Sequence, residues 1–337
     1  MKKFKAAVIG CGKISTRHLD AISALENVEL VAVCDNKEEA AISTARRYGV
    51  KYYTDYEELF RNEKLDAVHI CLPHYLHTLV AEKAFENGIS VLCEKPMSID
   101  FEDAVRAVRK AKEKNLKYSI VFQCRYNTPS QLVKKRIEDG RLGKVKCGNV
   151  TLTWARPDDY YDDSDWKGTW DKEGGGVIID QAIHSLDLAN WFVDSSVTDI
   201  KSSLHNRNHS RMQVEDTGEG LIRYENGAII SFFAMNNYLI NEPIEIRLCC
   251  ENGTVRLSYD DAIISYNDGS VETAENEPQK IVTYKDGKEY WGYQHAVQID
   301  RFYKSLAGEL PLEISGEEAL KIQNIICSIY KSNDSKI

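Results

Sequence analysis

The chain has 337 residues, 43% of them hydrophobic and 28% charged, and a formal net charge of −9 at pH 7. This composition predicts a soluble globular protein of two domains. The negative charge argues against nucleic acid or an anionic membrane as a partner, but leaves an anionic small substrate open.

The longest apolar runs are much shorter than the roughly 20 residues of a transmembrane helix. The basic amino-terminal residues are followed by an apolar run of strand length only. We therefore expect neither a membrane span nor a signal peptide.

The first third of the chain alternates short apolar runs with amphipathic segments. The runs, which predict strands, are Phe4 to Ile9, Glu29 to Cys34, Ala67 to Cys71, Ser90 to Cys93 and Tyr118 to Phe122. The amphipathic segments, which predict helices, are Ile14 to Leu25, Lys37 to Tyr48, Tyr75 to Asn87 and Phe101 to Asn115. This alternation predicts a parallel, doubly wound sheet, whose nearly continuous apolar strands are covered on both faces.

The pattern changes after about residue 123. Residues Pro129 to Asp139 predict a helix and Lys144 to Trp154 a strand. The polar, aromatic stretch Arg156 to Lys172 is too long for a tight turn, so we interpret it as a functional loop. A helix is predicted next, over Gly176 to Phe192.

Residues 197–282 predict an antiparallel sheet. Short strands alternate there with dipeptides that favour hairpin turns. These dipeptides are Asn226-Gly227, Asn252-Gly253 and Asp268-Gly269. Two helices, about Tyr293 to Leu306 and Gly316 to Tyr330, are predicted to close the chain.

The nine cysteines are scattered, and no two of them have CxxC spacing. Several end apolar runs, where a cysteine behaves as a small buried hydrophobic residue. We therefore predict reduced thiols in a cytoplasmic protein, with no disulfide and no zinc or other metal site.

A glycine-containing segment, Gly10-Cys11-Gly12-Lys13-Ile14-Ser15, follows the first predicted strand and opens a helix. In the dinucleotide-binding fingerprint, the first glycine permits a tight turn. The second lets the backbone approach a pyrophosphate at the helix amino end. Ser15 replaces the third glycine, and its small size makes this departure tolerable. The segment predicts that Gly10, Gly12, Lys13 and Ile14 bind a dinucleotide.

Asp35 ends the second predicted strand, about where an acid binds the adenosine ribose hydroxyls. A carboxylate there repels a 2′-phosphate, which favours NAD over NADP. Lys37 lies close by and leaves NADP possible. The alternative is that Asp35 N-caps the helix beginning near Lys37.

Glu94-Lys95-Pro96 follows the strand Ser90 to Cys93. Ligands bind at the carboxyl ends of strands in a doubly wound sheet, so we expect Lys95 near the nicotinamide. An ammonium group there can hydrogen-bond a substrate hydroxyl and stabilise a developing alkoxide. The alternative is a surface lysine paired with Glu94.

Asp180 and His184 follow the glycine run Gly174 to Gly176 at a spacing of i, i+4. This spacing places both side chains on one helix face. The acid can hold the imidazole and a substrate hydroxyl together, and the histidine can exchange the proton that accompanies hydride transfer. The alternative is a surface pair or a buried histidine with satisfied hydrogen bonds.

Together these motifs resemble the Gfo/Idh/MocA family of oxidoreductases, which includes glucose–fructose oxidoreductase and inositol dehydrogenase. The resemblance also rests on Leu72-Pro73-His74-Tyr75-Leu76-His77 and Gly316-Glu317-Glu318-Ala319-Leu320. The motifs run along nearly the whole chain in the family order.

The resemblance implies an α/β protein with two domains. Residues 1–122 would form an NAD-binding Rossmann domain. Residues 123–337 would form a C-terminal α/β domain for substrate binding and oligomerisation, with a large, open, mostly antiparallel sheet. A homodimer or homotetramer through that sheet is implied.

The resemblance also implies residue roles. Lys95, Asp180 and His184 match the catalytic set and would contact the substrate. The predicted cofactor contacts outside the glycine segment and Asp35 are Leu72, Pro73, His74, Glu94, Lys95 and Gln123.

Two residues matched by the resemblance, His74 and Arg125, each have two possible roles. The family more often has threonine and asparagine at Leu72 and His74, so His74 either contacts the cofactor or N-caps its helix. His77 is interpreted as structural. Arg125 serves either the substrate site or an ion pair.

The aromatic loop resembles a segment of family members that act on sugars, cyclitols and nucleotide sugars. Trp166 offers a ring face for stacking, and Arg156 can bind a carboxylate or phosphate. The alternative is that the rings of this loop pack it onto the domain.

We therefore predict an NAD-dependent dehydrogenase acting on a hydroxyl-bearing carbon of a sugar-like substrate. His184 is the preferred acid/base and Lys95 polarises the reacting oxygen, although these two roles can be exchanged. The alternatives are an NAD-recycling glycosidase of the same family and a non-catalytic NAD-binding regulator.

Overall fold

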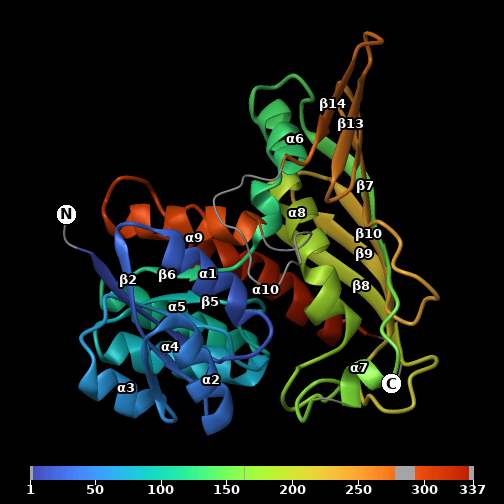
Figure 1. The fold of residues 1–337 in the computed structure, drawn as a ribbon. Coiled ribbons are helices and arrows are strands. Elements are labelled where there is room, and N and C mark those ends of the chain that lie inside the picture. Colours follow the sequence, from blue (N-terminus) through green and yellow to red (C-terminus); the bar gives the residue numbers. More distant parts are fainter. Residues whose placement is uncertain (1–2, 163, 278–292, 334–337) are drawn as a thin grey trace. The chain divides into compact units, whose positions relative to one another are not determined.

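The computed structural model describes residues 3–162, 164–277 and 293–333 (Figure 1). The chain divides into two compact units. The first comprises Met1–Gln123 and Pro278–Lys321, and the second Cys124–Glu277 and Ile322–Ile337.

The first unit contains a six-stranded parallel sheet in the order β3-β2-β1-β4-β5-β6. The strands are β1 (Phe4–Ile9), β2 (Val28–Cys34), β3 (Lys51–Tyr53), β4 (Ala67–Ile70), β5 (Ser90–Cys93) and β6 (Tyr118–Ile120). The predicted doubly wound sheet is confirmed, because the order reverses between β1 and β4, where ligands bind in such sheets.

Helices connect these strands, four of them where the sequence predicted helices. They are α1 (Ser15–Ala24), α2 (Glu38–Tyr48), α3 (Tyr56–Asn62), α4 (His77–Glu86) and α5 (Phe101–Glu113), with a 3₁₀ turn η1 (His74–Leu76). The side chain of Asp100 N-caps α5 by accepting from two backbone N–H groups, and Gly49 ends α2 at a φ of 71°. The sequence missed β3 and α3, since three partly exposed residues and seven helical ones are too short for a periodic pattern.

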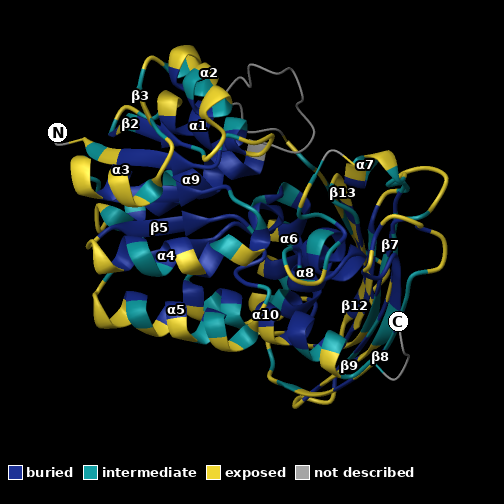
Figure 2. Cartoon of the chain, turned by 90° about the horizontal axis from the view of Figure 1, so that it is seen from below, coloured by how far each residue is buried: buried dark blue, intermediate teal, exposed yellow. Residues whose placement is uncertain are grey.

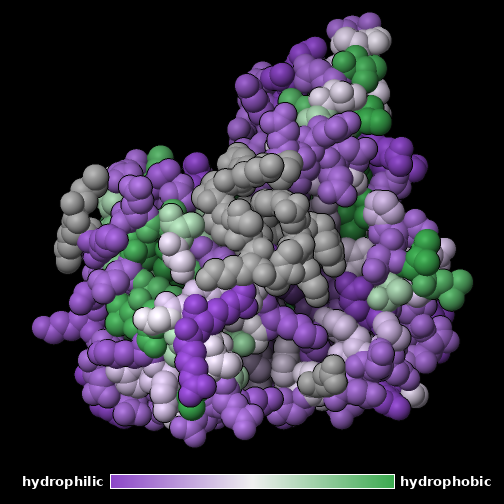
Figure 3. All heavy atoms as spheres, in the orientation of Figure 1, coloured by the Kyte–Doolittle hydropathy of each residue, from purple (hydrophilic) through white to green (hydrophobic). Residues whose placement is uncertain are grey.

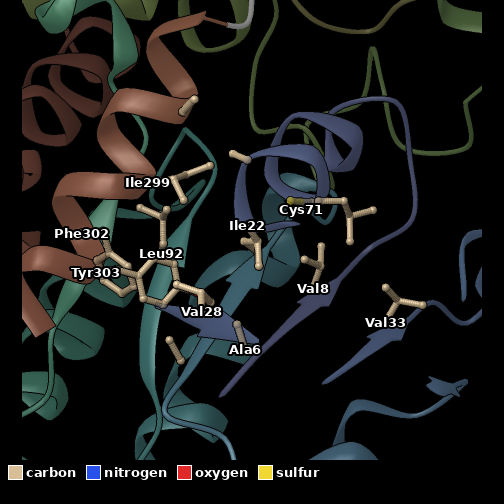
Figure 4. Close-up of a cluster of buried hydrophobic side chains, with 14 of the residues drawn as sticks. Ala6, Val8, Ile22, Val28, Val33, Cys71, Leu92, Ile299, Phe302 and Tyr303 are labelled. Carbon is tan, nitrogen blue, oxygen red and sulfur yellow. The ribbon is translucent and has the colours of Figure 1, made fainter. Parts of the chain in front are cut away.

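The helix α9 (Tyr293–Leu306) returns to the first unit and completes its core. Ile299, Phe302 and Tyr303 are each at most 1% exposed and belong to the same apolar cluster as β1 and α1 side chains (Figure 4). Gln298 accepts from the backbone N–H of Phe122 and donates to the carbonyl of Ile120. The compact first unit therefore includes α9, which the predicted division assigned to the second domain.

The second unit contains an eight-stranded sheet in the order β14-β13-β12-β11-β7-β10-β9-β8. The strands are β7 (Val145–Thr153), β8 (Val197–His205), β9 (Thr217–Tyr224), β10 (Ile229–Met235), β11 (Glu245–Cys250), β12 (Gly253–Leu257), β13 (Asp261–Tyr266) and β14 (Val271–Glu275). The pairs joined by the three predicted turns are antiparallel, whereas β7 and β10 run parallel. The predicted, mostly antiparallel sheet is confirmed.

Helices cover one face of this sheet. They are α6 (Thr128–Glu138), α7 (Asp159–Asp162), α8 (Ile183–Val193) and the end of α10 (Gly316–Lys331), whose first residues belong to the first unit. Buried residues alternate with intermediate or exposed ones along β10, and with exposed ones along β13. Figure 2 shows buried and exposed colours side by side in the strands around β12 and β13. One face of the sheet therefore lies against helices, and side chains of the other face reach the surface.

Hydrophilic residues predominate on the face drawn in Figure 3, with smaller hydrophobic groups between them. In the described part of the chain, no helix combines the length and apolarity that crossing a membrane requires. All nine cysteines are described and none forms a disulfide; six are buried, whereas Cys147 and Cys249 are exposed. The predicted core location therefore does not hold for these two.

Candidate active site

The nucleotide loop follows β1. Gly10 has a φ of +95°, and a Cβ there would lie 2.2 Å from the carbonyl oxygen of Cys71, so only glycine fits. Around Gly12, by contrast, no described heavy atom lies within 4 Å of the corresponding position. Ile14 precedes α1 without a side-chain cap. The helix amino end and the space at Gly12 fit a pyrophosphate.

Asp35 is tied to this loop. One carboxylate oxygen accepts from the backbone N–H of Cys11 at 2.8 Å, and the other accepts from that of Lys37 at 2.8 Å. Lys37, not Asp35, is the N-cap of α2, so the helix-capping alternative is wrong. The carboxylate instead fixes the glycine loop against the end of β2, beside the predicted ribose site.

The segment Leu72 to His74 lies beyond the end of β4. His74 sits inside the 3₁₀ turn, whose N-cap is Pro73, so the N-cap alternative for His74 is wrong as well. The ring nitrogens of His77 lie 2.6 Å from the carbonyl oxygen of Pro96 and 2.8 Å from that of Leu72. His77 therefore links the two predicted nicotinamide segments, in line with a structural role.

Glu94 and Lys95 follow β5. The Glu94 carboxylate is 6% exposed and contacts His18 Nε2 at 2.9 Å and His295 Nε2 at 3.4 Å. Lys95 is half-buried and is followed by a cis bond to Pro96. Gln123 is 4% exposed, and its Oε1 has no hydrogen-bond partner among the described residues, so it remains able to accept from a bound cofactor.

In the second unit, Asp180 lies in a π-helical turn, Ile178–Ala182, which leads directly into α8. The sequence predicted a regular α-helix over this segment, whereas in the structure a wide π-helical turn precedes the α-helix. His184 is in the first turn of α8 and 5% exposed, and Asp180 accepts from Gln181 Nε2 at 2.7 Å. Such wide turns occur often at functional sites.

The glycine run has a steric cause. A Cβ at Gly175 would lie 2.0 Å from the Tyr330 hydroxyl, and one at Gly176 would lie 1.9 Å from the carbonyl oxygen of Glu215. The Glu215 carboxylate accepts from the N–H groups of Gly176 and Ile178 at 2.9 and 3.1 Å, and from Tyr330 at 2.7 Å. Glu215 thus anchors the start of the helix that carries Asp180 and His184.

Glu173 is a second buried acid that the sequence did not single out. It is 1% exposed and accepts from the backbone N–H of Gly168. Burial, followed by the charge of Asp180, raises the pKa of Glu173 to about 9. Glu173 therefore carries a proton at neutral pH, which avoids a second buried negative charge near Asp180.

Arg125 forms a buried ion pair. Its Nε and Nη2 donate to the two oxygens of Asp187 at 2.7 and 2.6 Å, and the side chains are 4% and 1% exposed. The structure therefore supports the ion-pair alternative for Arg125. Because Asp187 lies three residues after His184, the pair holds α8.

The aromatic loop contains both packed and accessible groups. Trp154 and Tyr161 are 6% and 5% exposed, so these rings pack the loop. The Arg156 guanidinium lies over Trp154 and Tyr160, at 4.9 and 5.5 Å from the ring centroids, and Nη1 donates to Asn241.

Two cationic side chains approach Tyr160 from the loop. Besides Arg156, the Lys167 ammonium lies 3.6 Å from the Tyr160 ring centroid. Burial, and then the charge of Asp180, raises the pKa of the Tyr160 hydroxyl. Trp166 remains only half-buried. The sequence missed Lys167 as a member of this cluster.

Two family models match the chain. The model described as oxidoreductase family, NAD-binding Rossmann fold, matches residues 4–122. The model described as the GFO/IDH/MocA C-terminal domain matches residues 130–256. Together the two models match most of the chain, the first in the first compact unit and the second in the second.

Individual proteins that are similar to this chain support the same family assignment. The WlbA dehydrogenase of Bordetella pertussis, solved with NADH and UDP-GlcNAcA, is 30% identical with a TM-score of 0.87, covering 98% of this chain and 95% of that one. D-glucoside 3-dehydrogenase of Escherichia coli is 25% identical over 357 residues, covering 98% and 95%. The uncharacterized oxidoreductase YrbE of Bacillus subtilis is 25% identical over 234 residues, which span 68% of this chain and 66% of that protein. The chain belongs to the Gfo/Idh/MocA family and is an NAD-binding oxidoreductase.

Proposed function

We propose that the chain catalyses hydride transfer between NAD and a hydroxyl-bearing carbon of a sugar derivative. The observation that carries this proposal is the open space at Gly12, at the uncapped amino end of α1, in a chain that retains Lys95, Asp180 and His184. A regulator would need the nucleotide site but not the three reactive side chains.

Bound NAD supplies the hydride acceptor. The chain supplies the proton chemistry: His184 takes the proton of the substrate hydroxyl as the hydride leaves. The Lys95 ammonium hydrogen-bonds the same oxygen and stabilises its developing negative charge. Asp180 orients the hydroxyl and the imidazole. In the alternative assignment Lys95, as a neutral amine, takes the proton, and His184 donates a hydrogen bond.

We further propose a negatively charged sugar, in particular a nucleotide sugar acid, as the substrate. The Bordetella structure contains UDP-GlcNAcA, a sugar that carries a carboxylate and a diphosphate. In this chain Arg156 and Lys167 provide two cations beside Tyr160 and the half-buried ring of Trp166. Such groups bind a carboxylate or phosphate and stack on a sugar ring.

We also propose a homodimer or homotetramer that forms through the outer face of the eight-stranded sheet, which is the face that the helices leave uncovered. Leu221, Phe233 and Ile263 are each 37% exposed on β9, β10 and β13, whose alternate side chains are buried. The cytoplasmic location stays a prediction that rests on the scattered cysteines.

The test is a panel of inositols, aldoses, sugar acids and UDP-GlcNAcA, with NADH or NADPH formation followed by absorbance. We expect a substrate-dependent signal with UDP-GlcNAcA that is stronger with NAD than with NADP, because of Asp35. His184→Ala should lower turnover far more than NAD affinity, and unchanged turnover would remove His184 from the mechanism.

A flat trace from protein that binds NAD would contradict the dehydrogenase proposal. Release of a sugar from a glycoside, without net NADH formation, would then identify an NAD-recycling glycosidase. Binding of NAD without either activity would favour a regulator.

A further inference from the structure

A chain of four buried polar side chains crosses the first unit. Tyr303 Oη on α9 lies 2.9 Å from His69 Nε2 on β4, and His69 Nδ1 lies 2.8 Å from His18 Nδ1 on α1. His18 Nε2 lies 2.9 Å from an oxygen of Glu94, at the end of β5. Tyr303, His69 and His18 are fully buried, and Glu94 is 6% exposed.

This series of hydrogen-bonded side chains ends on the Glu94 carboxylate, which protein groups surround. The oxygen that contacts His18 also faces His295 Nε2 at 3.4 Å. The other oxygen accepts from the backbone N–H of Lys95 at 3.3 Å. Glu94 is therefore directed toward protein groups rather than toward a cofactor, which differs from the role that the sequence assigned to it.

The ionisation states are set by burial and by these contacts. Burial lowers the pKa of His18 and of His69, so both imidazoles are neutral near pH 7. Burial opposes ionisation of Glu94, but the hydrogen bonds from His18 and His295 outweigh it and hold the pKa of Glu94 well below its usual range.

These protonation states fix the direction of every hydrogen bond among the four side chains. A carboxylate only accepts, and a neutral imidazole has one N–H and one lone pair. His18 must therefore donate from Nε2 to Glu94 and accept at Nδ1. His69 then donates from Nδ1 and accepts at Nε2, which leaves the Tyr303 hydroxyl as the donor at the far end.

We propose that Glu94 is the positioning residue of Lys95, and that the one-directional chain from Tyr303 through His69 and His18 holds its carboxylate in place. Glu94 and Lys95 share a peptide unit whose N–H donates to that carboxylate. A rotation of the carboxylate would break its contacts with both histidines and with this N–H. The inference rests on the proposed function only in that it takes Lys95 to be the reactive lysine.

The direction of these hydrogen bonds is testable without a substrate. In full-length protein labelled with ¹⁵N-histidine, NMR distinguishes protonated from unprotonated ring nitrogens. We expect His18 to carry its proton on Nε2 and His69 on Nδ1. Tyr303→Phe identifies the His69 signals, because it removes the group facing Nε2. The reverse pattern, or a doubly protonated His18, would overturn the proposal.

Glu94→Gln tests the positioning role. An amide cannot accept at both ends, so one N–H of the new side chain meets either the histidines or the Lys95 N–H. We expect faster hydrogen exchange in the peptide covering Glu94 to Met97. We also expect kcat with UDP-GlcNAcA and NAD to fall about 10- to 100-fold, with the KM for NAD unchanged.

The matched control is Glu86→Gln on α4, which alters a surface ion pair with Lys110 on α5 and should leave exchange at Glu94 to Met97 unchanged. Unchanged exchange and turnover in folded Glu94→Gln would overturn the positioning role. Full turnover in Lys95→Met would instead contradict the proposed function, whereas the tautomers and the exchange rates would still report on Glu94.

Discussion

At the scale of single residues, the two glycines of the nucleotide loop are constrained by different neighbours. Gly10 is confined by the protein itself, through its positive φ and the carbonyl of Cys71. Gly12 faces open space, which we propose the pyrophosphate occupies. In this proposal the same residue type serves folding at one position and recognition at the other.

This difference predicts opposite outcomes for two alanine substitutions. Gly12→Ala should leave the thermal midpoint unchanged and weaken NADH binding about tenfold or more, since a methyl group occupies the space for the pyrophosphate. Gly10→Ala should destabilise the fold, because its Cβ would overlap Cys71. Isothermal calorimetry and thermal unfolding measure both, and unaltered NADH affinity in Gly12→Ala would contradict the assigned site.

A second residue-scale prediction concerns the buried acid Glu215. Burial raises its pKa from 4.5 to about 7, while the Tyr330 hydroxyl stabilises the ionised form. Since the folded state holds this proton more tightly than the unfolded chain does, ionisation of Glu215 lowers stability as pH rises from about 4.5 to 7. Tyr330 offsets part of that loss.

Tyr330→Phe should therefore cost more at alkaline than at acidic pH. Hydrogen bonds to charged groups are worth about 1.5–3 kcal/mol and neutral ones about 0.5–1.5 kcal/mol. We expect a loss of about 2 kcal/mol near pH 8 and about 1 kcal/mol near pH 5 in urea unfolding. Tyr224→Phe is the control, since its buried hydroxyl has no hydrogen-bond partner among the described residues. Equal costs at both pH values would contradict the assignment.

At the scale of elements, the helix that carries Asp180 and His184 is fixed at both ends of its active segment. Glu215 accepts from N–H groups at the start of the π turn, and the ion pair of Arg125 with Asp187 holds α8 just beyond His184. The side chains that we propose to be reactive are therefore positioned by buried polar contacts rather than by helix propensity.

Breaking that ion pair should be costly, because it leaves Asp187 buried and uncompensated. We expect Arg125→Met to lower the free energy of unfolding by about 3–5 kcal/mol. Arg223→Met is the control: Arg223 and Asp199 are 3.8 Å apart and about half exposed, and such a pair contributes about 0–1 kcal/mol. Chemical denaturation compares the two, and similar small losses would show that the buried pair does not hold α8.

At the scale of the whole molecule, the first unit is discontinuous in sequence. Its core needs α9, about 170 residues beyond β6 along the chain, since Phe302 and Tyr303 fill it. A fragment ending at Gln123 should therefore show no cooperative thermal transition by circular dichroism. A fragment that unfolds as sharply as the full chain would contradict this account.

The proposed assembly is also a whole-molecule property. If the outer face of the eight-stranded sheet joins copies of the chain, Phe233→Glu should convert the oligomer to monomer, because it buries an uncompensated charge. Light scattering after gel filtration measures the mass. Lys112→Glu, at an exposed position of α5 in the first unit, is the control, and a wild-type monomer would exclude the assembly.

The sequence by itself determined the features that depend on neighbours along the chain. Periodicity located most helices and the strands of the first unit except β3, and the dipeptides from Asn226 to Gly269 located three hairpins. The nucleotide loop was recognisable because a tight turn before a helix needs Gly10. In each case the physical cause acts within a few residues.

Tertiary structure alone decided which buried polar groups meet. Asp187 lies 62 positions from Arg125, Tyr330 lies 115 from Glu215, and Tyr303 lies 234 from His69. No local pattern marks such partners, because a buried donor needs an acceptor in space, wherever the chain supplies it. The motifs therefore led to the proposed reactive residues, whereas the contacts that hold their segments in place could be found only in the folded chain.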